Sequence, residues 1–174
     1  MRYGLCLLLS VFCSLGMSAQ SQTLRVDYIF SGTSRSAEIS LDEMSCFDGW
    51  AGRRVNLSEV PVRGNGQICM TDAQTGDTLY RQSFSTLFQE WQTTEEATKV
   101  RKSFENVFLL PMPSDKAIVY VEIYDFHGNV TASLKHAADP ADVYGQYLDK
   151  GFTMIQTDRP ELLINYLRSV GRHD

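Results

Sequence analysis

The stretch QICMTDAQTGDTLYRQSFSTLFQEW, residues 67–91, decides the fold of this 174-residue chain. Apolar and polar side chains alternate in the two runs Gln67–Asp72 and Asp77–Phe84, and the turn residues Thr75 and Gly76 stand between them. Alternation on both sides of such a turn is typical of a β-hairpin. The stretch therefore predicts a β-hairpin, which is followed by the apolar residues that cover the sheet.

Four large apolar residues at the end of this stretch follow a helical spacing. They are Phe84, Leu87, Phe88 and Trp91. Spacing at i, i+3, i+4 and i+7 places them on one face of a short amphipathic helix. Burial of apolar surface contributes about 25 cal/mol per Å². The free energy gained by burying these four side chains is therefore larger than that of any single polar interaction that the sequence suggests. We predict that these side chains have a structural role and that the helix packs over a sheet. The alternative is that the aromatic rings form a surface on which a ligand binds.

Other runs along the chain are typical of β-strands. They are Leu24–Phe30, Ser36–Leu41, a short run near Val55–Val60, Ser103–Leu110, and the pair Ala117–Phe126 and Val130–His136. The pair flanks Gly128-Asn129, which predicts a second hairpin, and Ser103–Leu110 is apolar enough on both faces to predict a mostly buried strand. Short strands separated by Gly and Pro turns predict an all-β fold, an immunoglobulin-like antiparallel β-sandwich with the short amphipathic helix over it.

The chain after the strands has a different pattern. Asp158 and Glu161 form a capping-box pair before an apolar stripe at helical spacing, and Gly171 follows that stripe. We therefore expect a sandwich domain over residues 20–143, and a connector with a C-terminal amphipathic helix over residues 144–174.

The N-terminus has the features of a secretory signal peptide. Arg2 is followed by the uncharged run Gly4–Leu15 and then by small residues up to Ala19. The run is too short to span a bilayer, which needs about 20 residues. We expect residues 1–19 to be removed and the protein to be secreted or periplasmic, exported to the cell envelope. A lipid anchor on Cys13 is the alternative.

The sequence predicts neither a nucleic-acid partner nor a membrane span. The chain carries a net charge of −5 and no basic cluster longer than Arg53-Arg54. Nucleic-acid binding needs clustered cations that neutralise phosphates, so nucleic acid is not an expected partner. No later segment is apolar and long enough to predict a membrane span.

Two cysteines remain once the signal peptide is removed, Cys46 and Cys69. Export permits a disulfide, and closing this loop of roughly 24 residues would stabilise the fold by roughly 3 kcal/mol. The alternative is two unpaired small side chains. No CxxC or Cys/His spacing indicates a metal or redox site.

The histidines do not form a pattern for catalysis. His127 stands at the second predicted turn, His136 lies roughly 20 Å along the returning strand, and His173 is near the C-terminus. The zinc-peptidase pattern HExxH, the GxSxG motif and a P-loop are absent from the sequence. Asp72 and Asp77 flank a turn without the alternating oxygens of a calcium loop. We expect no catalytic residue, no cofactor and no metal site.

Trp50 is the candidate ligand contact. It lies in FDGWAGRR, a glycine-rich segment over residues 47–54. In an exposed loop its ring would stack on a sugar or a peptide, because binding residues often stand on loops. Burial against the sandwich edge is the alternative.

Three stretches carry a resemblance to a known family. They are LDEMSCFDGWAGRRVNL (41–57), GNGQICMTDAQTGDTLYRQSFSTLFQEW (64–91) and SFENVFLLPMP (103–113). Over about Gln22–Val143 the chain resembles the N-terminal domain of the IgA-peptidase-type zinc metallopeptidases, metallopeptidase family 64, of anaerobic gut bacteria. The resemblance implies a β-sandwich ahead of a catalytic domain that holds all the zinc ligands, and no position here matches that zinc motif.

The resemblance sets the expected function. We expect a secreted, non-catalytic accessory domain that supports or positions a metallopeptidase catalytic domain, and not an enzyme in its own right. The sequence departs from the family near Tyr144 and ends at Asp174, which fits a stand-alone copy, a truncated or frame-shifted gene, or a fragment. The alternative function is a stand-alone extracellular glycan- or protein-binding module that uses Trp50, with an extracellular glycoprotein as partner.

Overall fold

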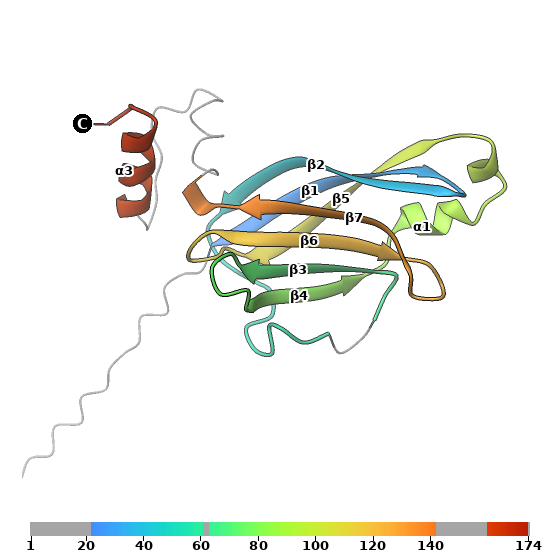
Figure 1. Cartoon of the computed structure of the whole chain (residues 1–174), viewed down its shortest axis with the longest axis horizontal. Helices are drawn as coiled ribbons and strands as arrows, with labels where there is room; N and C mark the ends of the chain where they lie inside the picture. The colour runs from blue at the N-terminus through green and yellow to red at the C-terminus, as the bar shows by residue number, and fades with distance from the viewer. Residues whose placement is uncertain (1–21, 61–62, 142–159, 174) are drawn as a thin grey trace, which may run out of the picture.

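The computed structural model describes residues 22–60, 63–141 and 160–173 (Figure 1). The elements follow in the order β1 (Thr23–Thr33), β2 (Ser36–Phe47), β3 (Gly66–Asp72), β4 (Thr78–Phe84), α1 (Leu87–Gln92), the 3₁₀ helix η1 (Glu96–Thr98), β5 (Lys102–Pro111), β6 (Ala117–Tyr124), β7 (Val130–Ala138) and α3 (Pro160–Ser169).

The strands form two antiparallel sheets. One has the order β2-β1-β5 and the other β4-β3-β6-β7. Figure 1 shows the sheets as two layers, with α1 at the end where the β1–β2 and β6–β7 turns lie. The predicted all-β class and the antiparallel β-sandwich are confirmed.

The core lies between the sheets because inward and outward side chains alternate along each central strand. In β1 the inward residues are Leu24, Val26, Tyr28 and Phe30, all fully buried or nearly so. In β6 they are Ala117, Val119, Val121 and Ile123, each with no exposed surface. A period of two buries one face of a strand and leaves the other to solvent.

The first predicted hairpin is confirmed, and its turn explains the aspartate at its start. Oδ1 of Asp72 accepts hydrogen bonds from the backbone N–H groups of Gln74 (2.7 Å) and Thr75 (2.8 Å), and Gly76 has a φ of +78°. These bonds lower the pKa of Asp72, and the bond from the Thr75 backbone has the largest effect. The carboxylate therefore shapes the turn, as Asx turns do.

The helix α1 is shorter than the predicted stripe. Thr86 is extended and its Oγ1 accepts from the backbone N–H of Gln89 at 3.2 Å, so the helix starts only at Leu87. Phe84 consequently belongs to β4, and Leu87 is 71% exposed. Placing Phe84 and Leu87 on the buried face of one helix was wrong, whereas Phe88 and Trp91 are buried as predicted.

Two strand predictions also need correction. The predicted strand near Val55–Val60 is a loop, in which Asn56 has a positive φ of 52°. β5 confirms the strand over Ser103–Leu110, but it is buried on one face only: Val107 and Leu109 are 49% and 45% exposed. These two residues lie on the face of β5 that points away from the buried residues Phe108 and Leu110, so they are only partly covered.

The loop over residues 48–60 is held against the edge strand β4 by one arginine. Arg53 donates to the carbonyl oxygens of Leu57 (2.9 Å), Glu59 (2.7 Å) and Arg81 (2.6 Å). The backbone N–H of Arg81 also donates to the carbonyl of Leu57 at 2.8 Å. These bonds cover part of an exposed sheet edge, which proteins commonly protect.

The second predicted hairpin and the C-terminal helix agree with the structure where it describes them. β6 and β7 form the second hairpin, with Gly128 at a φ of +85°. α3 lies within the predicted helix over residues 158–171, and Gly171 has the expected positive φ of 70°. The predicted signal peptide and most of the connector lie outside the described residues.

Candidate functional site

Tyr28 of β1 and His136 of β7 make a polar contact between the two sheets. The hydroxyl oxygen of Tyr28 and Nε2 of His136 are 2.6 Å apart, and Nδ1 of His136 is 2.9 Å from the carbonyl oxygen of Ala137. A carbonyl can only accept, so Nδ1 carries the proton and Nε2 accepts from Tyr28. Burial lowers the pKa of His136 and raises that of Tyr28. Both ring nitrogens are engaged, so the pair joins the sheets rather than offering a free base.

The other histidines lie apart from this pair. His127 is exposed in the β6–β7 turn, and His173 lies beyond α3. Within residues 22–60, 63–141 and 160–173, no group of three or more His, Cys, Asp or Glu side chains is arranged to hold a metal ion.

Trp50 does not present its ring to solvent. Its side chain is 8% exposed and meets Tyr80 edge to face, with ring centroids 5.8 Å apart. Its Nε1–H donates to the carbonyl oxygen of Arg53 at 2.9 Å. The ring therefore takes the buried position that was the alternative to an exposed ligand contact, and it helps to fix the loop over β4.

The two cysteines lie in different sheets. Cys46 is on β2, opposite Leu24, and Cys69 is on β3. The structure does not join them to each other by a disulfide. Cys69 is 8% exposed, since Arg81 and Tyr120 lie opposite it on the neighbouring strands.

A groove of about 640 Å³ lies at the α1 end of the sandwich. Its walls come from the β1–β2 turn (residues 34–37), from Asn65, from α1, and from the end of β6 with the following turn (residues 124–126). A second hollow of about 490 Å³ shares Asn65 and residues 124–126 with it and adds Arg63. The two hollows share these lining residues, and we call them together the end groove.

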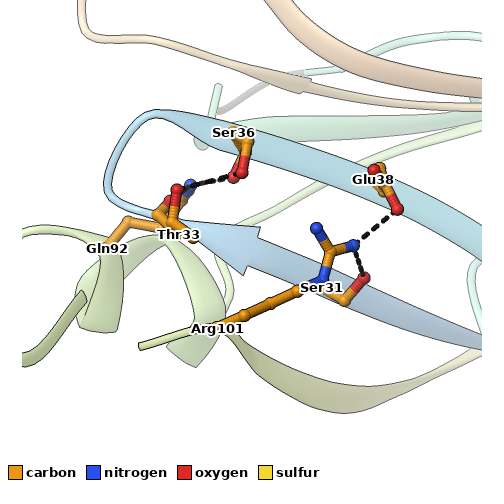
Figure 2. A network of polar contacts seen from close by, with 6 residues as sticks. All are labelled: Ser31, Thr33, Ser36, Glu38, Gln92 and Arg101. Atoms are coloured by element: carbon orange, nitrogen blue, oxygen red, sulfur yellow. Dashed lines mark hydrogen bonds and ion pairs between the residues drawn. The ribbon is translucent and has the colours of Figure 1, made fainter. Parts of the chain in front are cut away.

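The β1–β2 wall of the end groove is fixed by α1. Nε2 of Gln92 donates to the carbonyl oxygens of Thr33 (2.8 Å) and Ser36 (3.1 Å). The hydroxyls of Thr33 and Ser36 lie 3.0 Å apart across the turn (Figure 2). The backbone N–H of Ser34 donates to the carbonyl of Ala97, in η1, at 2.9 Å. This wall is therefore tied to elements far away in the sequence.

An arginine strengthens the same wall from outside. Arg101 donates to the hydroxyl of Ser31 at 2.9 Å and to Oε2 of Glu38 at 2.5 Å, which joins β1 to β2 beyond the turn (Figure 2). The Arg101–Glu38 ion pair is about half-exposed, so it contributes little stability by itself. Its effect is to orient the strands that carry the turn.

The floor of the end groove is held by Gln89. Its Nε2 donates to the carbonyl oxygens of Asn65 and Tyr124, both at 3.0 Å. The backbone N–H of Tyr124 donates to the carbonyl of Asn65 at 2.7 Å. Each glutamine of α1 thus binds two backbone carbonyls, so this short helix organises the β1–β2 wall and the floor of the groove.

The opposite wall ends in an exposed aromatic ring. Phe126 is 93% exposed at the tip of the β6–β7 hairpin, and its ring centroid is 3.9 Å from that of His127. Asp125 fixes the tip by accepting from the backbone N–H groups of His127 and Asn129, both at 2.8 Å. The Asn129 side chain adds a third bond at 2.9 Å. These bonds lower the pKa of Asp125, and the bond from the Asn129 side chain has the largest effect.

Several polar groups of the end groove are available to a ligand. Within the described part of the chain, the Arg35 guanidinium, the Asn65 side-chain amide, the Ser34 hydroxyl and Oε1 of Gln92 enter no hydrogen bond. The charged residues that line the groove are two cations, Arg35 and Arg63, and one anion, Asp125, whose oxygens already accept hydrogen bonds. The groove therefore offers mainly neutral hydrogen-bonding groups beside an aromatic ring.

Sequence reasoning missed this groove. It is assembled from segments spread between residues 34 and 131, and pairing between strands brings them together. The one local signal was DFHGN at residues 125–129, where an aromatic residue stands in a turn that otherwise contains turn-forming residues.

The described part of the chain is a β-sandwich module with its own apolar core and a groove at one end. The chain belongs to the peptidase M64 N-terminus family, whose model matches residues 16–135. This match confirms the resemblance to the N-terminal domain of metallopeptidase family 64. A comparison with curated proteins gives no match. Among the described residues, no helix has the length and apolar character needed to cross a membrane.

Proposed function

We propose that this chain acts as a non-catalytic accessory domain that supports or positions a metallopeptidase catalytic domain. The observation that carries the proposal is the family match, because it is to the N-terminal part of a peptidase and reaches from before β1 into β7. A sandwich with its own core is a unit that can fold by itself and pack against a second domain.

The roles of the polar residues agree with this proposal. Asp72 and Asp125 shape turns, His136 joins the two sheets, and Arg53 holds a loop. Each of these side chains is engaged in a contact that maintains the fold. Catalysis would require a nucleophile or a metal with an accessible base, and these residues serve structural purposes instead.

Export is the second part of the proposal. The pattern of residues 1–19 supports it, with one basic residue, a short apolar run and small residues at the expected cleavage site. An accessory domain of a secreted peptidase would be exported to the same compartment as the peptidase.

One purification tests both parts. The full-length chain is expressed in a bacterium and the exported protein is collected, and its intact mass, zinc content and cleavage of casein are measured. We expect a mass that corresponds to cleavage near Ala19, substoichiometric zinc after dialysis and no chelator-sensitive cleavage. A complete M64 peptidase serves as the positive control for zinc and cleavage. Retention of Met1 would contradict export, and stoichiometric zinc with chelator-sensitive cleavage would contradict the non-catalytic role.

A binding module is the second candidate function. The observation that favours it is the end groove with Phe126 at its margin. Trp50, the ligand contact expected from the sequence, is buried, so in this version of the proposal the binding surface lies at the end of the sandwich where α1 is.

A further inference from the structure

We propose that the end groove binds an oligosaccharide, with the ring of Phe126 stacked on one sugar. This inference rests on the binding role given above as the second candidate function, and it does not depend on the accessory role. It assigns the groove residues Phe126, Asn65, Ser34 and Gln92 to the binding site.

The first argument is the position of Phe126. A single exposed apolar side chain is ordinary on a protein surface. Phe126, however, is 93% exposed on a tip that three hydrogen bonds to Asp125 hold in place, and it lines both hollows of the groove. Their volumes, about 640 and 490 Å³, are in the range of about 300 to 1,000 Å³ found for ligand sites.

The second argument is the chemistry of the lining. A sugar ring has C–H groups on its faces and hydroxyls at its rim. The face of an aromatic ring is electron-rich and attracts such C–H groups. The amide of Asn65, the hydroxyl of Ser34 and Oε1 of Gln92 can pair with the hydroxyls, because they enter no hydrogen bond within the described residues.

The third argument is that the walls are already in place. Gln92 holds the β1–β2 turn, Gln89 holds Asn65 and Tyr124, and Asp125 holds the Phe126 tip. A ligand that enters such a groove does not have to order the chain around it, which removes part of the entropic cost of binding.

The same contacts disfavour an extended peptide. Peptides that add to a strand need free backbone groups along an edge. Around the end groove, the carbonyls of Thr33 and Ser36 already accept from Gln92, and those of Asn65 and Tyr124 accept from Gln89. An extended chain would therefore find few backbone partners, whereas a sugar can use the free side chains.

The test uses the purified chain on an array of neutral and acidic oligosaccharides, with a matched array of unglycosylated peptides. Affinity for the best-bound oligosaccharide is then measured by calorimetry. We expect Phe126→Ala and Phe126→Leu to weaken binding at least about fivefold, and Phe126→Trp to retain it, because stacking requires an aromatic face. Asn65→Ala should weaken binding about threefold or more, since a hydrogen bond to the sugar is lost.

Controls separate binding from folding. Val55→Ala changes an exposed apolar side chain, 72% exposed, that does not line the groove, and should bind as the unmodified chain does. All variants should melt within a few degrees of the unmodified chain because Phe126, Asn65 and Val55 are exposed. The inference is overturned if no oligosaccharide binds at millimolar concentration, if only peptides bind, or if Phe126→Ala binds unchanged. Because the catalytic partner is absent from this test, none of these outcomes bears on the accessory role.

Discussion

Trp91→Ala is expected to lower the free energy of unfolding by about 3 to 5 kcal/mol. Trp91 is 9% exposed, and its ring centroid is 5.6 Å from that of Phe104 and 6.1 Å from that of Phe88. Its Nε1–H donates to Oε2 of Glu96 at 2.8 Å. The substitution would leave a cavity between α1 and β5 and would remove that hydrogen bond.

Leu87→Ala is the matched control because it lies on the same helix. Leu87 is 71% exposed, so its truncation should change the stability by no more than about 0.5 kcal/mol. Urea denaturation gives the free energy of unfolding of each variant. Circular dichroism follows the unfolding of both variants, and tryptophan fluorescence also follows that of Leu87→Ala. Equal losses in the two variants would mean that the helix does not pack as described.

Arg53→Met is expected to cost about 2 to 4 kcal/mol, the second-largest effect. The guanidinium donates to three carbonyl oxygens, those of Leu57, Glu59 and Arg81, and lies 5.5 Å from the centre of the Tyr80 ring. Methionine can cover the ring but cannot donate, so the loop over β4 would lose its main attachment.

Arg54→Met is the control for this change. Arg54 is exposed and, among the described residues, makes one side-chain bond, of 3.1 Å, to the carbonyl of Trp50, so the cost should stay below about 1 kcal/mol. Hydrogen exchange of the Arg81 amide, which donates to Leu57, reports the loop directly. The account of this loop fails if Arg53→Met leaves both the stability and that exchange rate unchanged.

Most strands were predictable because the chain marks them locally. The alternation in β3, β4 and β6 follows the period of a strand that is buried on one face, and Gly76 and Gly128 take the positive φ that turns need. Burial of β5 was overestimated, because apolar side chains on both faces of a strand do not show which face the opposite sheet covers. That depends on how the two sheets pack, which the local sequence does not specify.

The end of β4 shows why the helical stripe was misread. The apolar spacing from Phe84 to Trp91 fits a helix, but it also fits a strand end followed by a short helix. Thr86 decides between these, because its side chain caps the helix and its extended backbone separates Phe84 from α1. The periodicity of the apolar residues carries no information about such a break.

The candidate site was less predictable than the fold. Trp50 was the predicted ligand contact because it is a tryptophan in a glycine-rich loop. Its ring instead packs on Tyr80, and Arg53 holds the loop against β4. Phe126 stands out only once the β1–β2 and β6–β7 turns are seen at the same end of the sandwich (Figure 1). A site between turns depends on the pairing of strands, which local sequence patterns do not specify.

The accessory role is tested most directly by adding this chain to a catalytic domain of an M64 peptidase from which the peptidase's own N-terminal domain has been removed. Calorimetry measures the association, and that own N-terminal domain, added back, is the positive control. We expect a saturable complex with this chain. No measurable heat with this chain, under conditions in which the peptidase's own domain binds, would contradict it.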